Sequence, residues 1–341
     1  MRIAVTYGPM CLQRSAEETF ADPRTGSEIG WRRIVDGLET LGHDVATDQC
    51  TEGVATECDA AVSINEPDSL RPFAGLAKLR VCAFWLNEFS FCKEGFDDHV
   101  NLYLSPSEAH RQKAIGDWGA PKPEKWAVNK LGCDPPSDAG AKVPGRVVYC
   151  SSPDRGLHRV LATWPNIKRA APDASLRIFY NLATWLRSFD TTPHYPPIER
   201  LRARALWCEE ALKRLSGPEW GITVVDQVSH DELMREMQMA EVLAHPCETT
   251  SWSEGFSVTV LEGCANGAVP IISDCDALGE VYSTLDPVPV GDWDRWRSRV
   301  VQALTDKDFR DDLNRKARAL AEELTWTRHC KQLETELLSR L

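Results

Sequence analysis

Short apolar runs of strand length alternate with longer segments of helical spacing along most of the chain. Residues 2–6 form the first run, and residues 27–42 place apolar side chains near helical spacing, with Ser27 expected to cap the helix and Gly42 to end it. Further strand-like runs follow at residues 44–47, 60–64, 81–86, 101–104 and 125–131. Strands that alternate with helices favour a parallel sheet covered on both faces. The sequence therefore predicts an α/β fold.

A segment rich in proline and glycine divides this alternation into two parts. Residues 134–145 contain three prolines and two glycines, and a new strand-like run begins at residue 146. The length of 341 residues also corresponds to about two domains. We therefore expect two Rossmann-like domains over residues 1–140 and 141–325, with a ligand in the cleft between them. A C-terminal helix over 326–341 can pack back on the first domain.

The composition of the chain indicates which classes of binding partner and which cellular compartment to expect. The net charge is −12, from 39 basic and 51 acidic residues, which argues against nucleic acid as the main partner. No apolar stretch approaches the roughly 18 residues that a transmembrane helix needs, and the N-terminus lacks the apolar core of a secretory signal. The 12 cysteines form no CxxC pair. Reduced, packed cysteines in a cytoplasmic protein explain them better than disulfides or a metal site.

The segment from Thr249 to Ser273 is the densest in candidate functional residues. Glu254 and Glu262 flank a predicted turn from loop to helix, where the backbone amides of 255–257 form a natural pocket for a diphosphate. Gly255 would let the backbone approach a ligand closely. Two solvent-facing glutamates on an amphipathic helix are the alternative. Because Glu262 follows an apolar helical stretch, we expect it to be buried and to need a hydroxylic partner.

A second candidate is the short polar loop after the strand-like run at residues 146–150. It carries Arg155 and Gly156, and a helical segment follows it. A guanidinium at the carboxyl edge of a parallel sheet suits a pyrophosphate. The alternative is an arginine that only caps its own loop.

These two segments together resemble glycosyltransferase family 4, the retaining glycosyltransferases of the GT-B fold. Residues 254–262 look like the family's E-x7-E segment, and residues 152–157 look like its phosphate-binding loop, with Arg155 in place of the usual lysine. Residues 26–28 and the following helix resemble the family's N-terminal loop and first helix. Residues 229–233 resemble the segment before the helix beside the nucleobase.

The resemblance implies a role for each matching residue. Glu254 would contact the donor sugar and, with Arg155 neutralising the leaving diphosphate, would form the catalytic pair. Glu262 would hold the ribose hydroxyls. On the acceptor side, Asn87 or Glu88 would stand where many members place a histidine. The implied donor-binding residues are Glu262, Gly255, Phe256, Ser257, Ser152, Gly156, Gly26, Asp226 and Val228.

The predicted function is that of a retaining glycosyltransferase in the cytoplasm. It would move a sugar from a UDP- or GDP-sugar to a hydroxyl acceptor (a sugar, a lipid-linked sugar or a small molecule), with the donor on the C-terminal domain and the acceptor on the N-terminal one. A nucleotide-sugar epimerase and a catalytically silent nucleotide-sugar-binding protein remain alternatives.

We expect no metal and no cofactor. Two Asp-x-Asp triplets are present, but Asp274 and Asp276 fit loop residues near the donor, and Asp292 fits a helix N-cap. Trp252 could stack on a sugar or serve packing. The histidines on predicted helices, which are His110, His158 and His329, are expected at the surface.

Overall fold

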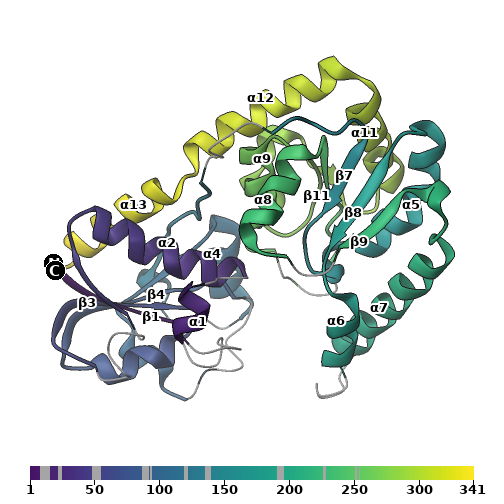
Figure 1. Cartoon of the computed structure of the whole chain (residues 1–341). Coiled ribbons are helices and arrows are strands. Elements are labelled where there is room, and N and C mark those ends of the chain that lie inside the picture. Colours follow the sequence, from purple (N-terminus) through teal and green to yellow (C-terminus); the bar gives the residue numbers. More distant parts are fainter. Residues whose placement is uncertain are drawn as a thin grey trace. The chain divides into compact units, whose positions relative to one another are not determined.

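The chain folds into two compact units in a computed structural model. The first unit comprises Met1–Gly132 and Leu324–Leu341, and the second comprises Cys133–Glu323 (Figure 1). The structure describes residues 1–7, 16–21, 25–47, 55–86, 92, 94–118, 122–134, 140–189, 196–225, 228–249, 252 and 254–341. The first unit thus ends at Gly132, eight residues before the boundary expected from the sequence, and it includes the end of the chain.

The first unit is built on a six-stranded sheet of parallel strands in the order β2-β1-β3-β4-β5-β6. Its strands are β1 (Arg2–Tyr7), β2 (Asp44–Thr47), β3 (Cys58–Ile64), β4 (Ala77–Ala83), β5 (Leu102–Ser105) and β6 (Trp126–Val128). Ile3 pairs with Ala60 and Val81 with Leu102, and all four side chains are buried. Continuous apolar runs of this kind are typical of parallel strands covered on both faces.

Helices cover this sheet. They are α1 (Ala16–Ala21), α2 (Gly26–Thr40), α4 (Glu108–Gly116) and α13 (Trp326–Leu338), with 3-10 turns η1 (Pro67–Phe73), η2 (Phe96–His99) and η3 (Pro123–Lys125). The expected cap at Ser27 is wrong, because Thr25 caps α2 in a reciprocal capping box with Glu28. The Ser27 hydroxyl instead accepts a hydrogen bond from the Asn65 side chain at 3.0 Å.

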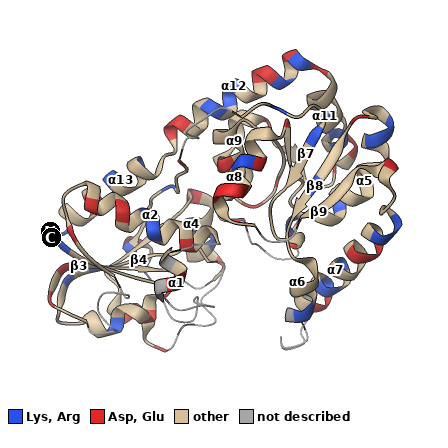
Figure 2. Cartoon of the chain, in the orientation of Figure 1, with Lys and Arg blue, Asp and Glu red and all other residues tan. Residues whose placement is uncertain are grey.

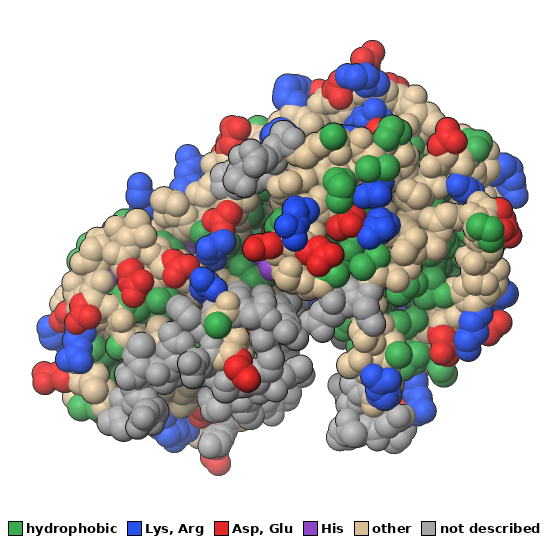
Figure 3. Space-filling model, viewed as in Figure 1, with side chains coloured by type: hydrophobic (Ala, Val, Ile, Leu, Met, Phe, Trp, Pro, Cys, Tyr) green, Lys and Arg blue, Asp and Glu red, His purple; other side chains and the backbone are tan. Residues whose placement is uncertain are grey.

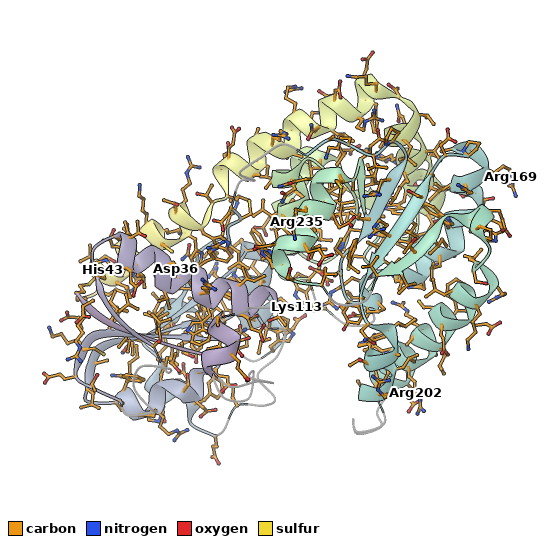
Figure 4. The ribbon with its side chains drawn as sticks, viewed as in Figure 1. Asp36, His43, Lys113, Arg169, Arg202 and Arg235 are labelled. Carbon is orange, nitrogen blue, oxygen red and sulfur yellow. The ribbon has the colours of Figure 1, made fainter. Side chains whose placement is uncertain are left out.

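The C-terminal helix α13 packs on α2 within the first unit. Leu333 and Leu337 join the buried core of this unit, and Gly37 of α2 lies so close to Cys330 that an added Cβ would stand 2.3 Å from its sulfur. His43 follows α2 (Figure 4). Its Nε2 lies 2.9 Å from a carboxylate oxygen of Glu334 in α13. A segment almost 200 residues away from β6 therefore completes the core of the N-terminal unit.

The second unit repeats the architecture with a sheet in the order β12-β11-β10-β7-β8-β9, again of parallel strands. Its strands are β7 (Arg146–Tyr149), β8 (Ser175–Phe179), β9 (Ile222–Val225), β10 (Val242–His245), β11 (Val269–Asp274) and β12 (Val288–Pro289). Its α-helices are α5 (Leu157–Ala170), α6 (Leu182–Ser188), α7 (Pro196–Arg214), α8 (His230–Met239), α9 (Val258–Asn266), α10 (Leu278–Val281), α11 (Trp293–Thr305) and α12 (Lys307–Glu323). Its 3-10 turns are η4 (Pro153–Arg155), η5 (Pro218–Trp220) and η6 (Ser283–Leu285).

Two tryptophans fix helices against this second sheet. Trp164 of α5 and Trp296 of α11 are fully buried, and their indole N–H groups donate to the carbonyls of Trp220 and Ile271 at 2.8 and 3.0 Å. Such partners remove the cost of burying the polar end of the ring. The Asp292 carboxylate accepts from the Arg295 amide at 3.1 Å, which confirms the predicted N-cap of α11.

The expectation that the helical histidines lie at the surface is wrong. His110 and His329 are buried, and the side chain of His158 is only 12% exposed. Oxygen atoms lie near the rings: Ser105 Oγ and Leu86 O are 2.7 and 2.8 Å from His110, and a carboxylate oxygen of Glu248 is 3.4 Å from His158 Nε2. Burial lowers the pKa of all three histidines to about 4. Helical periodicity cannot tell a histidine that finds such partners from one in water.

The described surface carries both signs of charge. Acidic and basic side chains are interspersed along α7 and α12, and hydrophobic side chains lie scattered between them (Figures 2 and 3). Each cysteine that the structure describes is a free thiol, and all of these except Cys92 are buried. No described helix is long and apolar enough to span a bilayer.

Candidate active site

The candidate site residues gather at the carboxyl edge of the second sheet. Strands β11, β10 and β7 are neighbours in the sheet order, and each continues into a loop at that edge. Because parallel strands end on the same side, the loop after β7 and the loop after β10 meet there. The contact between them is direct: Gly156 lies so near residue 246 that an added Cβ would stand 1.9 Å from the Pro246 carbonyl oxygen.

Arg155 lies at the centre of this edge and is held by two carboxylates. Its Nε donates to Glu254 Oε1 at 2.6 Å, and a terminal nitrogen donates to the neighbouring Asp154. The loop itself is fixed, since the Tyr149 hydroxyl donates to the Ser152 carbonyl at 2.6 Å. Gly156 then adopts a left-handed φ of 102° and begins α5. Arg155 therefore does more than cap its own loop: it pairs with the first glutamate of the E-x7-E segment.

Burial strengthens this ion pair. The Arg155 and Glu254 side chains are 18% and 8% exposed. Burial raises the pKa of Glu254, and the positive charge of Arg155 opposes that effect. For Arg155, burial acts to lower the pKa, but Glu254 and Asp154 outweigh it and hold the guanidinium charged well above its ordinary range. The site thus contains a permanent buried cation at the position predicted for the diphosphate.

Asp276 fixes the backbone of Glu254. It lies after β11 with a left-handed φ of 54°, and its Oδ2 accepts from the Glu254 amide at 3.0 Å and from the Thr249 hydroxyl at 3.2 Å. Sequence reasoning placed both Asp274 and Asp276 in a loop near the donor. That is wrong for Asp274, which is the last residue of β11, while Asp276 lies in the loop and orients a catalytic candidate.

The helix start after Glu254 differs in detail from the prediction. The residue in the left-handed conformation is Ser257, with φ 69°, and among the described residues its side chain caps none of the first-turn amides of α9. The Tyr282 hydroxyl holds this turn by donating to the Ser257 carbonyl at 2.7 Å. Phe256 is 2% exposed and packs edge-on against Tyr282. Helix α9 thus begins four residues after Glu254, and Phe256 serves as the anchor of the turn.

Glu262 is buried as predicted, at 7% exposure, but its partner was not predicted. His230, the first residue of α8, places Nε2 2.7 Å from Glu262 Oε1, where the sequence suggested only a hydroxylic partner. The side chain of His230 is 23% exposed, and that of Glu262 is 9% exposed. Val228 lies two residues before His230 and packs against a buried cluster of the second unit. The segment 229–233 was recognised from sequence, and the histidine within it was the available signal.

Two side chains near the pair, together with Glu254 itself, offer metal-binding atoms. Among the described residues, His245, Cys247 and Glu254 each present one such atom, and these atoms lie within 4.8 Å of one another. Burial and the nearby Arg155 charge lower the pKa of His245 to about 3, so the imidazole is neutral. The guanidinium 2.6 Å from Glu254 opposes a cation in the same place. His245 and Cys247 are therefore better suited to orient the Glu254 side chain than to bind a metal ion.

The remaining predicted residues fall elsewhere. Asn87, Glu88 and Asp226 lie outside the described residues. Gly26 is the first residue of α2 in the first unit, and a Cβ there would meet nothing within 4 Å. Ser152 lies in the Arg155 loop and donates its hydroxyl to Asp154. The structure therefore brings Ser152, Arg155, Gly156, Glu254 and the start of α9 together, and it pairs Glu262 with α8.

Comparison with known proteins finds a family match for part of the second unit. Residues 209–320, which contain the whole segment from Glu254 to Glu262, match the family described as Glycosyl transferases group 1. The predicted family resemblance is confirmed for this segment, and with it the presence of a glycosyltransferase-family enzyme domain. No curated protein matches the chain.

Solved structures confirm the GT-B fold over the full length. The sucrose-phosphate synthase of Thermosynechococcus elongatus aligns with a TM-score of 0.70 at 14% identity and covers 100% of both chains. HepE of Anabaena, solved in complex with UDP and glucose, aligns with a TM-score of 0.68 at 15% identity and covers 100% of both chains. An α,α-trehalose-phosphate synthase (UDP-forming) of Burkholderia vietnamiensis aligns with a TM-score of 0.70 at 10% identity, covering 99% of this chain and 97% of that one.

Proposed function

We propose that this protein is a retaining, metal-independent glycosyltransferase that uses a UDP- or GDP-sugar and a hydroxyl acceptor. The observation that carries the proposal is the buried Arg155–Glu254 pair, with Glu254 four residues before the start of α9, where the Ser257 side chain caps no amide of the described residues. Glu254 of that pair lies within residues 209–320, the segment that matches the glycosyl transferases group 1 family. The similarity to HepE, which was solved with UDP and glucose, supports UDP over other nucleotides.

In the proposed reaction, the protein stabilises the negative charge that develops on the departing nucleoside diphosphate. Arg155 supplies a fixed positive charge, and the amides at the start of α9 supply the positive end of a helix dipole. Neither must reorganise during bond cleavage. Charge stabilisation that grows toward the transition state raises the rate of the chemical step. With a permanent guanidinium in place, this leaving-group role requires no metal ion.

Glu254 and Glu262 have different proposed tasks. Glu254 is oriented from two sides, by Arg155 and by Asp276, so its carboxylate can accept a hydroxyl of the donor sugar in one geometry. Glu262 keeps an oxygen beyond the one that His230 contacts, and that oxygen can accept from the ribose hydroxyls. We assign the donor to the C-terminal domain, over 141–325, and the acceptor to the N-terminal domain, over 1–140.

We further propose the cytoplasm as the site of action. The buried free thiols that the structure describes fit a reducing compartment, since they serve as small apolar packing residues.

A donor and acceptor screen with matched variants tests the proposal. Wild type, Glu254→Gln and the surface control Glu219→Gln are incubated with UDP- and GDP-sugars and an acceptor panel, with and without EDTA. We expect transfer by the wild type and the control, unaffected by EDTA, with the anomeric configuration of the product retained by NMR. Glu254→Gln should still bind nucleotide but lose transfer. Nucleotide binding without turnover of any donor would support a silent binding protein, and conversion of the donor without an acceptor would support an epimerase.

A further inference from the structure

The loop that carries Arg155 also carries an acid that occupies the same guanidinium. The negative charge of Asp154 cannot attract a diphosphate. Its carboxylate pairs directly with Arg155 and also accepts a hydrogen bond from the Ser152 hydroxyl. An acid at this position does not strengthen the binding of a pyrophosphate to the loop. Asp154 therefore needs an explanation other than the affinity of the loop for a pyrophosphate.

The charges around Arg155 show that the guanidinium is already neutralised. Arg155 faces the two carboxylates of Asp154 and Glu254, and the Asp276 carboxylate, which accepts from the Glu254 amide, adds a third negative charge nearby. His245, with its pKa lowered to about 3, is neutral. A diphosphate entering here would meet net negative charge unless one carboxylate leaves the guanidinium.

The geometry decides which carboxylate can leave. Glu254 is fixed through its backbone, because its amide donates to Asp276 and its carbonyl accepts from the Ala277 amide at 3.0 Å. Its side chain is 8% exposed, against 16% for that of Asp154. The backbone of the loop is fixed by Tyr149 and Gly156, so Asp154 needs only a side-chain rotation to release Arg155 and reach water.

We propose that Asp154 is an internal anion that holds Arg155 when no donor is bound and yields it to the diphosphate, which weakens nucleotide binding and speeds release of the product. This inference rests on the proposed function, because it requires a nucleoside diphosphate at Arg155. Release of product limits the turnover of many enzymes, so an acid that competes with the leaving diphosphate raises the rate of the cycle.

The test compares Asp154→Asn with wild type in calorimetric titrations with UDP, GDP and the corresponding nucleosides. Asparagine keeps an oxygen for the Ser152 hydroxyl but removes the charge. We expect the variant to bind the preferred nucleoside diphosphate about tenfold more tightly, a change of about 1.4 kcal/mol, with nucleoside binding unchanged. Asp173→Asn, a loss of the same charge at an exposed position of the same unit, is the matched control and should bind like wild type.

Each outcome separates the inference from the function on which it depends. Equal or weaker diphosphate binding by Asp154→Asn, with the wild type binding normally, overturns the inference alone. Tighter binding of the nucleoside as well would also overturn it, since Arg155 would not be the cause. Absence of binding by wild type and variants alike overturns the proposed function and this inference with it. Asp154→Ala, checked for folding by thermal unfolding, repeats the comparison should the asparagine variant be unstable.

Discussion

Replacing Gly156 by alanine should damage the donor loop more than any other single methyl group added in the second unit. Gly156 has a φ of 102°, and its Cβ would lie 1.9 Å from the carbonyl oxygen and 2.6 Å from the carbonyl carbon of Pro246. Both atoms belong to the backbone of the segment that follows β10, so no flexible side chain can move aside.

The expected cost has two parts. A non-glycine residue in the left-handed region costs about 1–2 kcal/mol. Forcing the backbone apart to admit the methyl group adds about 1–3 kcal/mol, as overpacked sites do. We therefore expect Gly156→Ala to lower the free energy of unfolding by about 2–5 kcal/mol. Because the displacement moves Arg155 relative to Glu254, the Kd for nucleoside diphosphate should rise at least tenfold, on the order of 1.4 kcal/mol.

A second glycine provides the control. Gly291 has a φ of 100°, but a Cβ there would meet nothing within 4 Å. Gly291→Ala should therefore show the conformational cost alone, about 1–2 kcal/mol, with unchanged nucleotide binding. Urea unfolding and calorimetric nucleotide titration of both variants measure the difference. If Gly156→Ala is no less stable than Gly291→Ala, the close contact between the two loops does not exist as described.

Three further predictions concern polar side chains that make specific hydrogen bonds. His230→Ala leaves the Glu262 carboxylate without its imidazole partner and should lower stability by about 1–3 kcal/mol and weaken nucleotide binding, as urea unfolding and titration will show; wild-type stability would contradict this. His110 has its pKa lowered to about 4 by burial, so its stabilising effect is complete above the unfolded value of 6.5 and is lost as the pH falls toward 4. The loss amounts to about 3 kcal/mol at about 1.4 kcal/mol per pH unit, and His110→Gln should flatten the measured dependence of stability on pH. Lys142 donates to the carbonyls of Ala240 and Gly267 at 2.8 Å, and Lys142→Met should lower the melting temperature through a loss of about 1–3 kcal/mol, whereas an unchanged value would show that water replaces these bonds.

Much of the fold was predictable because hydrophobic periodicity is a local property. The runs at 2–6 and 146–150 became β1 and β7, and the helical pattern over 258–266 matches α9. Element ends were less accurate, since caps depend on geometry: Thr25 took the role given to Ser27. The short helix α6 was not predicted, because a helix of about two turns is too short to show a clear hydrophobic periodicity in the sequence.

The candidate site was predictable as a set of residue types but not as a set of partners. Glu254, Arg155 and Glu262 were all expected to act on a ligand. Asp276 is expected near the donor, but its contact with the Glu254 amide and the contact of His230 with Glu262 follow from no spacing pattern. The acid at Asp154 was likewise visible in the sequence, but its charge acquires meaning only when its carboxylate is seen to face the same guanidinium as Glu254.

The sequence by itself determined two α/β units, their parallel strands and the segments that carry the chemistry, because alternation, caps and short motifs act over a few residues. Tertiary structure alone decided which charges meet. Arg155 and Glu254 are 99 residues apart in the chain, and His230 and Glu262 are 32 apart. The neighbouring strands β7 and β10 bring the loops of the first pair together, and the contact of α8 with α9 brings the second pair together. Burial strengthens the Arg155–Glu254 contact, since little water remains to screen it. The C-terminal helix shows the same division: its amphipathic pattern predicts a helix, but only the folded chain places Leu333 and Leu337 in the core of the N-terminal unit.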